Sequence, residues 1–143
     1  MRTQTLSAAL LLTCVTFVYA QTSTKTKATL TPEAVEQSAI VIDTHADTPQ
    51  RIADEGYDLA APLNGGNWNL ESAHKGNLGA EFFSIWVDPK PNEGHFARRT
   101  LVLSDAVKQE VAKHPDQMML ATAPADIEKA HREHKIAALM GIE

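Results

Sequence analysis

Three runs of apolar residues along the chain predict the strands of a parallel sheet. They span Ala39 to Asp43, Ala80 to Val87 and Ile136 to Glu143. None shows a regular alternation of apolar and polar positions, which is typical of strands that are covered on both faces. Four large residues of the second run are expected in the core: Phe82, Phe83, Ile85 and Trp86.

Sequence signals for helices occur before the first run and between the second and third runs. Three helices are expected, over residues 31–38, 98–114 and 124–135. The first begins where a capping hydroxyl at Thr31 precedes Pro32, the residue type favoured at the first helical position. In the second, Leu103, Val107 and Val111 share one helical face. The third has acids in its first turn and bases in its last, which matches the helix dipole.

The remaining segments carry weaker signals. A long loop is expected from about Asp54 to Leu78, with Asn64 to Gly66 as its clearest turn, and Met118 to Leu120 forms only a short apolar patch. The succession of strand, helix and strand predicts an α/β fold with a parallel sheet. Three strands do not complete such a fold, because a parallel (β/α)8 barrel takes about 250 residues.

Composition and charge narrow the classes of function. The chain has 143 residues, of which 43% are apolar and 22% charged, as in soluble globular domains. Its formal net charge of −5 argues against nucleic acid as a general partner. The same charge argues against a polybasic patch that binds membranes.

Residues 1–20 have the outline of a secretory signal peptide. An early basic residue, Arg2, precedes an apolar run from Leu6 to Tyr19, and Ala20 offers a small residue for cleavage before Gln21. A membrane anchor and a buried helix remain alternatives, but the run is shorter than the roughly 20 residues of a spanning helix. The protein is therefore expected to be exported, to the periplasm or the extracellular space.

Cleavage after Ala20 would leave a mature chain without cysteine, because Cys14 is the only one. No disulfide could then form in an oxidising compartment. Residues 21–31 are expected to be a polar tether, and residues 32–143 to belong to the folded domain.

The first apolar run leads into VIDTHADTP, residues 41–49, in which His45 and Asp47 stand two positions apart. In an extended chain such side chains point the same way. The carboxyl ends of parallel strands are where ligands and catalytic groups collect, and imidazole and carboxylate are good ligands for Zn²⁺. A histidine that hydrogen-bonds a carboxylate in a turn is the plainer interpretation, since H-x-D is common by chance.

Glu143 ends the third apolar run and is expected at the same edge of the sheet as His45. An ordinary solvated acid is the alternative for this residue. Taken together, His45, Asp47 and Glu143 form one candidate metal site.

From about Ala39 to Glu143 the chain resembles the membrane (renal-type) dipeptidases, zinc peptidases of family M19 in the amidohydrolase superfamily. The matching segments are VIDTHADTP, GNLGAEFFSIWV, ARRTL with a later HP pair, and HKIAALMGIE. Their order and spacing are similar to the N-terminal part of such an enzyme. The H-x-D pair resembles the dipeptidase branch, because most amidohydrolases carry H-x-H there, and the closing GIE is similar to the start of the family's G-[IV]-E-G-G segment.

This resemblance implies a (β/α)8 TIM barrel of the metallo-dependent hydrolase type, with two zinc ions at the carboxyl ends of its strands. It implies that His45 and Asp47 bind the first ion and that Glu143 bridges both. The reaction implied is hydrolysis of dipeptides, including those with a D-residue on the C-terminal side, by a hydroxide that bridges the metals. Some family members also open β-lactams. A homodimer is a candidate assembly of the full-length protein.

The family's other functional groups would follow Glu143: two histidine ligands, a substrate-binding histidine and arginine, and an aspartate for proton transfer. The chain is therefore expected to be the N-terminal third or so of an enzyme, and to be inactive alone. Two alternatives are another metal-dependent amidohydrolase and a non-catalytic secreted binding domain. No role is assigned to the remaining histidines: His74, His95, His114, His131 and His134.

Overall fold

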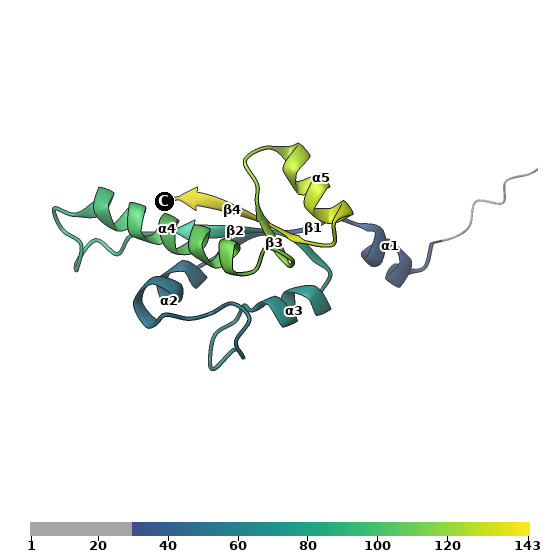
Figure 1. Cartoon of the computed structure of the whole chain (residues 1–143), viewed down its shortest axis with the longest axis horizontal. Helices are drawn as coiled ribbons and strands as arrows, with labels where there is room; N and C mark the ends of the chain where they lie inside the picture. The colour runs from purple at the N-terminus through teal and green to yellow at the C-terminus, as the bar shows by residue number, and fades with distance from the viewer. Residues whose placement is uncertain (1–29) are drawn as a thin grey trace, which may run out of the picture.

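The computed structural model describes residues 30–143 (Figure 1). In chain order its elements are α1 (Pro32–Ser38), β1 (Val41–Ala46), α2 (Thr48–Glu55), α3 (Leu70–Lys75), β2 (Leu78–Ile85), α4 (Phe96–Lys113), β3 (Met118–Leu120), α5 (Pro124–Arg132) and β4 (Ile136–Ile142). The expected signal peptide and nearly all of the expected tether lie outside the described residues. Within residues 30–143, no helix is long and apolar enough to cross a membrane.

All four strands run parallel, in the spatial order β1-β2-β4-β3. The α/β class and the parallel sheet predicted from the apolar runs are confirmed. The expected number of strands is wrong, because Met118–Leu120 is a strand and not merely an apolar patch. Its residues pair from Met118 opposite Ile136 to Leu120 opposite Ala138, so β3 covers only the first half of the outer edge of β4.

Strand β1 lies two to three residues later than its apolar residues predicted, and it continues through polar residues to Ala46. Its pairing with β2 accounts for the difference, since Val41 lies opposite Leu78 and Ala46 opposite Phe83. Backbone hydrogen bonding across the sheet therefore extends β1 beyond its apolar run, into the residues of the candidate site.

The long loop expected between the first two strands contains the helix α3, which corrects that prediction. Asn69 caps this helix: its side-chain oxygen accepts a hydrogen bond from the backbone N–H of Ser72 at 2.9 Å. The Ser72 hydroxyl in turn accepts from the backbone N–H of Asn69 at 3.3 Å, which completes a capping box. These two polar residues stabilise a helix that has too few turns to show an apolar period.

Helices cover both faces of the sheet (Figure 1). Helices α2, α3 and α4 lie on one face, where Phe83 and Ile85 of β2 pack against Leu103 and Val107 of α4. All four side chains are fully buried or nearly so. The helical face predicted from the spacing of Leu103, Val107 and Val111 is therefore confirmed.

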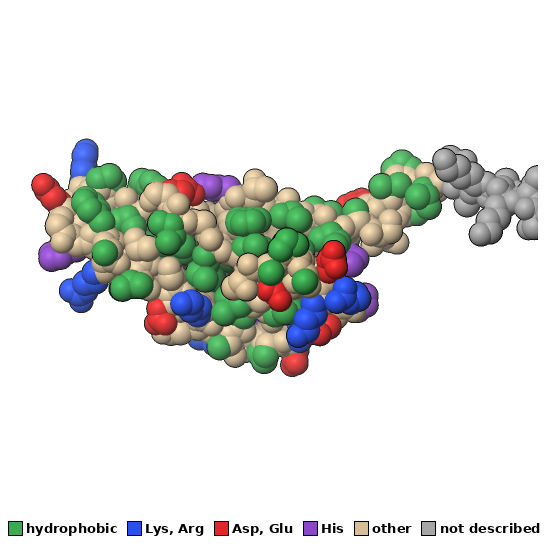
Figure 2. All heavy atoms as spheres, turned by 90° about the horizontal axis from the view of Figure 1, so that it is seen from above, with side chains coloured by type: hydrophobic (Ala, Val, Ile, Leu, Met, Phe, Trp, Pro, Cys, Tyr) green, Lys and Arg blue, Asp and Glu red, His purple; other side chains and the backbone are tan. Residues whose placement is uncertain are grey.

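Helix α5 covers the other face, over the amino-terminal part of the strands. Its contact with the sheet is built from four buried alanines: Ala80, Ala121, Ala130 and Ala137. Small side chains let the helix lie close to the strands. The carboxyl-terminal part of this face is not covered by α5 and carries the exposed Trp86, and hydrophobic side chains are spread over this side of the molecule in Figure 2. The expectation that Trp86 belongs to the core is wrong, because it lies just past β2, on the side that α2–α4 do not cover.

Glu81, in the middle of β2, is a fully buried carboxyl group. It lies opposite Asp43 in the sheet, and neither of its oxygens has a hydrogen-bond partner in the described residues. Burial, with a smaller contribution from the charge of Asp43, raises the pKa of Glu81 from 4.5 to about 8, while the Trp68 indole acts in the opposite direction. The fold therefore holds this group in its neutral form at neutral pH.

We expect Glu81 to make the fold less stable as the pH rises. Between pH 4.5 and about 8 the unfolded chain releases this proton and the folded chain keeps it, so the free energy of unfolding falls. The free energy of unfolding can fall by at most about 1.4 kcal/mol per pH unit from this one group. Urea midpoints measured across this range should fall for the wild type relative to Glu81→Gln, while the exposed Glu71→Gln follows the wild type. Parallel curves for the wild type and Glu81→Gln would contradict the assignment.

Candidate functional site

The three predicted site residues meet at the carboxyl ends of β1 and β4. Nε2 of His45 lies 3.3 Å from Oδ1 of Asp47, and Nδ1 of the same ring lies 3.2 Å from Oε1 of Glu143. Ser84, next to the end of β2, donates a hydrogen bond from its hydroxyl to the same Glu143 oxygen at 2.9 Å. The imidazole therefore stands between the two carboxylates.

A bulge in β1 turns His45 toward this site. Between Asp43 and Ala46 the strand uses one residue more than β2 uses between Glu81 and Phe83. The backbone N–H of His45 leaves the sheet and donates to Oδ1 of Asp43 at 3.1 Å. Because Ala46 pairs with Phe83 and packs with the α2–α4 core, its neighbour His45 emerges on the opposite face, which Ser84 also faces.

Asp47 lies beside His45, but its backbone conformation differs from the one that the sequence predicted. Alternation along an extended strand was expected to align the two side chains, but Asp47 is no longer extended, with φ −79° and ψ 15°. It is the N-cap residue of α2, and its carboxylate makes no capping hydrogen bond. The carboxylate is thus left available for a ligand beside His45.

The donor set suits a first-row transition metal. Nε2 of His45 and Oδ1 of Asp47 are close enough to share one ion at the usual distances of about 2.0–2.2 Å. Glu143 instead contacts Nδ1, a position from which a carboxylate orients a metal-bound imidazole. The donor atoms of the three residues do not yet surround one point, so Glu143 must turn away from Nδ1 to reach an ion beside Asp47.

These groups are open to solvent. The exposed fractions of the side chains are 52% for His45, 69% for Asp47 and 40% for Glu143. A cavity of about 370 Å³ adjoins His45 and Asp47, and its other wall includes Gly66 and Trp68.

The wall of this cavity is held by Arg51 of α2. Its Nη1 donates to the backbone oxygen of Leu63 at 3.1 Å, and its Nε donates to Glu55 at 3.1 Å. Its guanidinium also lies 4.2 Å from the centre of the Tyr57 ring. A Cβ at Gly66 would lie 1.9 Å from Arg51 Nη1, so a larger residue there would displace the guanidinium from its present position.

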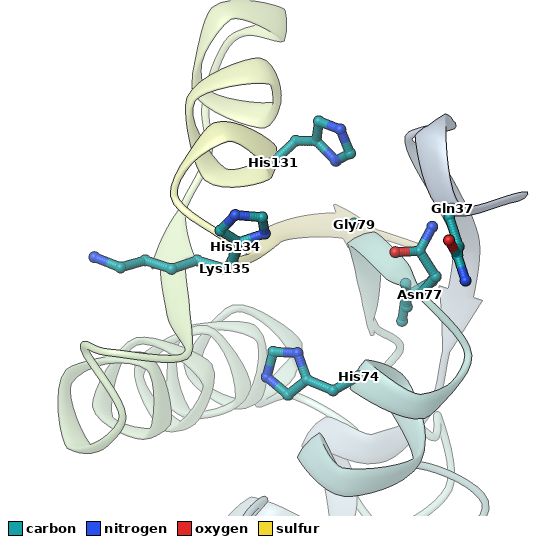
Figure 3. A pocket seen from close by; sticks show the side chains of 8 residues that line it. Gln37, His74, Asn77, Gly79, His131, His134 and Lys135 are labelled. Carbon is teal, nitrogen blue, oxygen red and sulfur yellow. The ribbon is translucent and has the colours of Figure 1, made fainter. Parts of the chain in front are cut away.

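Two features of the fold were not predicted from the sequence. Ser84 was visible only as one polar residue inside an apolar run, near the end where ligands collect. Three histidines that received no role, His74, His131 and His134, line one cavity of about 280 Å³ at the opposite edge of the sheet (Figure 3). They come from α3, from α5 and from the turn after α5, so no local spacing could have linked His74 to the other two.

Comparison with known proteins identifies the family. The family model described as membrane dipeptidase (peptidase family M19) matches residues 31–143. The chain is 32% identical over 116 residues to the dipeptidase ataJ of Aspergillus terreus, across 72% of this chain and 28% of that protein.

Solved structures agree on the fold. The probable dipeptidase PvdM from Pseudomonas aeruginosa is similar with a TM-score of 0.65 and 20% identity, over 77% of this chain and 29% of that one. A metallo peptidase from Rhodobacter sphaeroides was solved with a phosphinate mimic of the dipeptide L-Ala-D-Ala. It is similar with a TM-score of 0.61 and 15% identity, over 73% of this chain and 38% of that one. The described residues have the fold of part of a (β/α)8 barrel, and the chain spans well under half the length of these relatives. It belongs to the membrane dipeptidase family, peptidase family M19.

Proposed function

We propose that the full-length protein is a zinc-dependent dipeptidase. The observation that carries this proposal is the contact of His45 with Asp47 at the carboxyl end of β1, in a chain of the M19 family. The relatives support the reaction class, since two are named as dipeptidases and a third, a metallo peptidase, was solved with a dipeptide mimic. Substrates are therefore proposed to be dipeptides, including those with a D-residue on the C-terminal side.

In this proposal His45 and Asp47 hold one zinc ion, and Glu143 bridges it to a second. Bound zinc lowers the pKa of water toward neutrality and polarises a peptide carbonyl. The chain's own residues prepare the site. Asp47 is free of capping, and Ser84 holds one oxygen of Glu143 by a hydrogen bond of 2.9 Å. Ser84 is therefore a positioning residue that limits the rotation of Glu143.

The proposal is tested with the purified full-length protein. Hydrolysis of L-Ala-L-Ala and L-Ala-D-Ala is measured as released alanine, before and after chelation and again after zinc is restored. We expect turnover that chelation removes and zinc restores. A folded, zinc-loaded protein that cleaves neither dipeptide would contradict the proposal and favour a binding domain, whereas turnover of other amides alone would favour a different amidohydrolase activity.

Export is proposed from the sequence of residues 1–20. The apolar run ends in a small residue at Ala20, so a signal peptidase is expected to cut before Gln21. N-terminal sequencing of the secreted protein should begin at Gln21. Protein that is found in the cytoplasm and still begins at Met1 would show the proposal to be wrong.

A further inference from the structure

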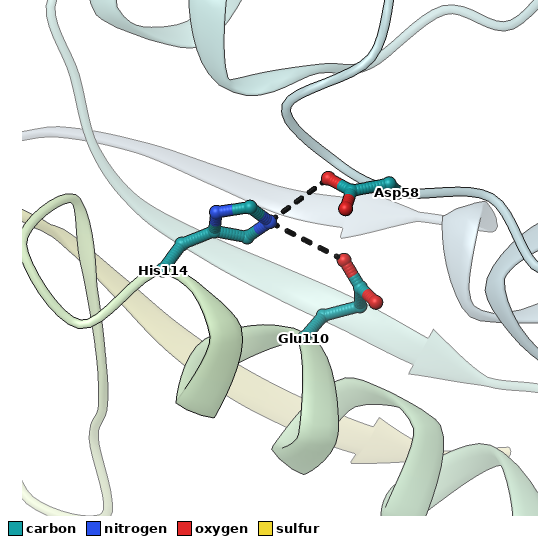
Figure 4. Close-up of side chains that lie close together, drawn as sticks. All are labelled: Asp58, Glu110 and His114. Atoms are coloured by element: carbon teal, nitrogen blue, oxygen red, sulfur yellow. Dashed lines mark hydrogen bonds and ion pairs between the residues drawn. The ribbon is translucent and has the colours of Figure 1, made fainter.

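A second group of metal-ligating side chains lies on the side of the sheet that α2–α4 cover, away from His45. Glu110 and His114 are four residues apart at the end of α4, and Asp58 approaches them from the segment after α2 (Figure 4). Nε2 of His114 lies 2.9 Å from Oδ1 of Asp58 and 3.7 Å from Oε2 of Glu110. One nitrogen of a single imidazole therefore faces both carboxylates, unlike the arrangement at His45.

The donor atoms of this cluster are already gathered. One ligand atom from each of Asp58, Glu110 and His114 lies within 4.8 Å of the others, and within residues 30–143 this is the one such group of three. Small movements of these side chains would bring all three atoms to ordinary metal–ligand distances of about 2.0–2.2 Å from one ion. The three histidines around the cavity of Figure 3 do not meet this condition.

Charge and burial favour a cation at this point. The Glu110 side chain is only 1% exposed, and a buried carboxylate needs a compensating charge. Lys113 supplies one by binding Oε1 of Glu110, but Asp58 brings a second carboxylate. One negative charge is left for an imidazolium or for a bound cation.

Neighbouring groups orient both carboxylates as they do around bound metals. The backbone N–H of Leu59 donates to Oε2 of Glu110 at 3.1 Å, and that of Ala60 donates to Oδ1 of Asp58 at 2.8 Å. Such hydrogen bonds fix the direction of ligating oxygens and raise metal affinity. The set of one imidazole nitrogen and two carboxylate oxygens, with room for water on the half-exposed side of Asp58, matches the ligands of Zn²⁺.

We propose that Asp58, Glu110 and His114 form a structural zinc-binding site. The ion links the segment after α2 to the end of α4. Because that segment leads into the turn at Gly66, the ion stabilises the wall of the cavity beside His45. The site does not depend on the proposed dipeptidase activity.

The test counts zinc ions in the full-length protein. Wild type and variants are loaded with zinc chloride, dialysed and analysed for metal per chain, and their thermal unfolding is followed with and without zinc. Asp58→Asn and His114→Asn are expected to lose one ion per chain and to show a smaller zinc-induced rise in Tm. Two controls, Asp105→Asn on the exposed side of α4 and His131→Ala in the cavity of Figure 3, should match the wild type.

The variants also separate this site from the site at His45. Asp58→Asn on a His45→Ala background should still remove one further ion, whether or not the protein cleaves dipeptides. Equal metal content and equal zinc response in the wild type, Asp58→Asn and His114→Asn would overturn the proposal and leave an ion pair between His114 and the carboxylates. Should His114→Asn fail to fold, the half-exposed Asp58→Asn decides the outcome alone, through its metal content.

Discussion

Replacing His45 by alanine in the full-length protein is expected to lower bound zinc and dipeptidase rate together, with the rate falling by more than about 100-fold. Loss of a residue that only hydrogen-bonds to a metal ligand lowers metal affinity or activity by about 10–100-fold. His45 does more, because its Nε2 stands beside Asp47 and its Nδ1 beside Glu143. Without this ring the two carboxylates have no common neighbour.

Asp47→Ala should give the same paired loss of zinc and rate. The matched control is His95→Ala, which removes an exposed histidine at the start of α4. Metal analysis beside an assay of dipeptide hydrolysis measures both effects. Normal zinc and a normal rate in either site variant would show that these residues are not metal ligands.

The largest effect on stability is expected for Phe83→Ala. Phe83 is fully buried between β2 and the layer of α2–α4, and its ring packs against Trp68 edge to face at 5.3 Å, with the planes at 72°. Truncating a buried phenylalanine costs about 3–5 kcal/mol, because the lost contacts leave a cavity that the core fills only in part. The aromatic pair adds about 0.5–1.5 kcal/mol to the contact.

Urea unfolding of the full-length protein measures this cost. Phe96→Ala, at the exposed start of α4, is the matched control and should change the midpoint little. Similar losses for the two variants would contradict the assignment of Phe83 to the main core. A loss of cooperativity in Phe83→Ala alone would support it, since the α2–α4 layer would separate from the sheet.

Apolar patterning predicted most of the sheet because a strand that is buried on both faces needs a continuous run of apolar residues. The runs that begin at Ala80 and Ile136 correspond to β2 and β4. The three predicted helices correspond to α1, α4 and α5. Three elements were missed, α2, α3 and β3, and the last two were missed because their stability comes from contacts that local patterning does not show. The three residues of β3 depend on pairing with β4, and α3 depends on the capping box at Asn69.

For the candidate site, the sequence identified residue types and their edge of the sheet, but not their arrangement. His45 and Asp47 could be paired because they are neighbours in the chain. The bulge that turns His45 toward Ser84 depends on register with β2, which no local pattern contains. The same holds for the contact of Asp58 with His114, since 56 residues separate them.

Helix α5 packs on the same face of the sheet as the candidate site. The alanines under this helix, Ala80 and Ala137, lie on the same face of the sheet as Ser84 and Glu143, further down the strands. Within residues 30–143, α5 therefore covers the amino-terminal part of the face on which Ser84 and Glu143 lie, and the exposed side chains of the site stand at the uncovered carboxyl ends of the strands.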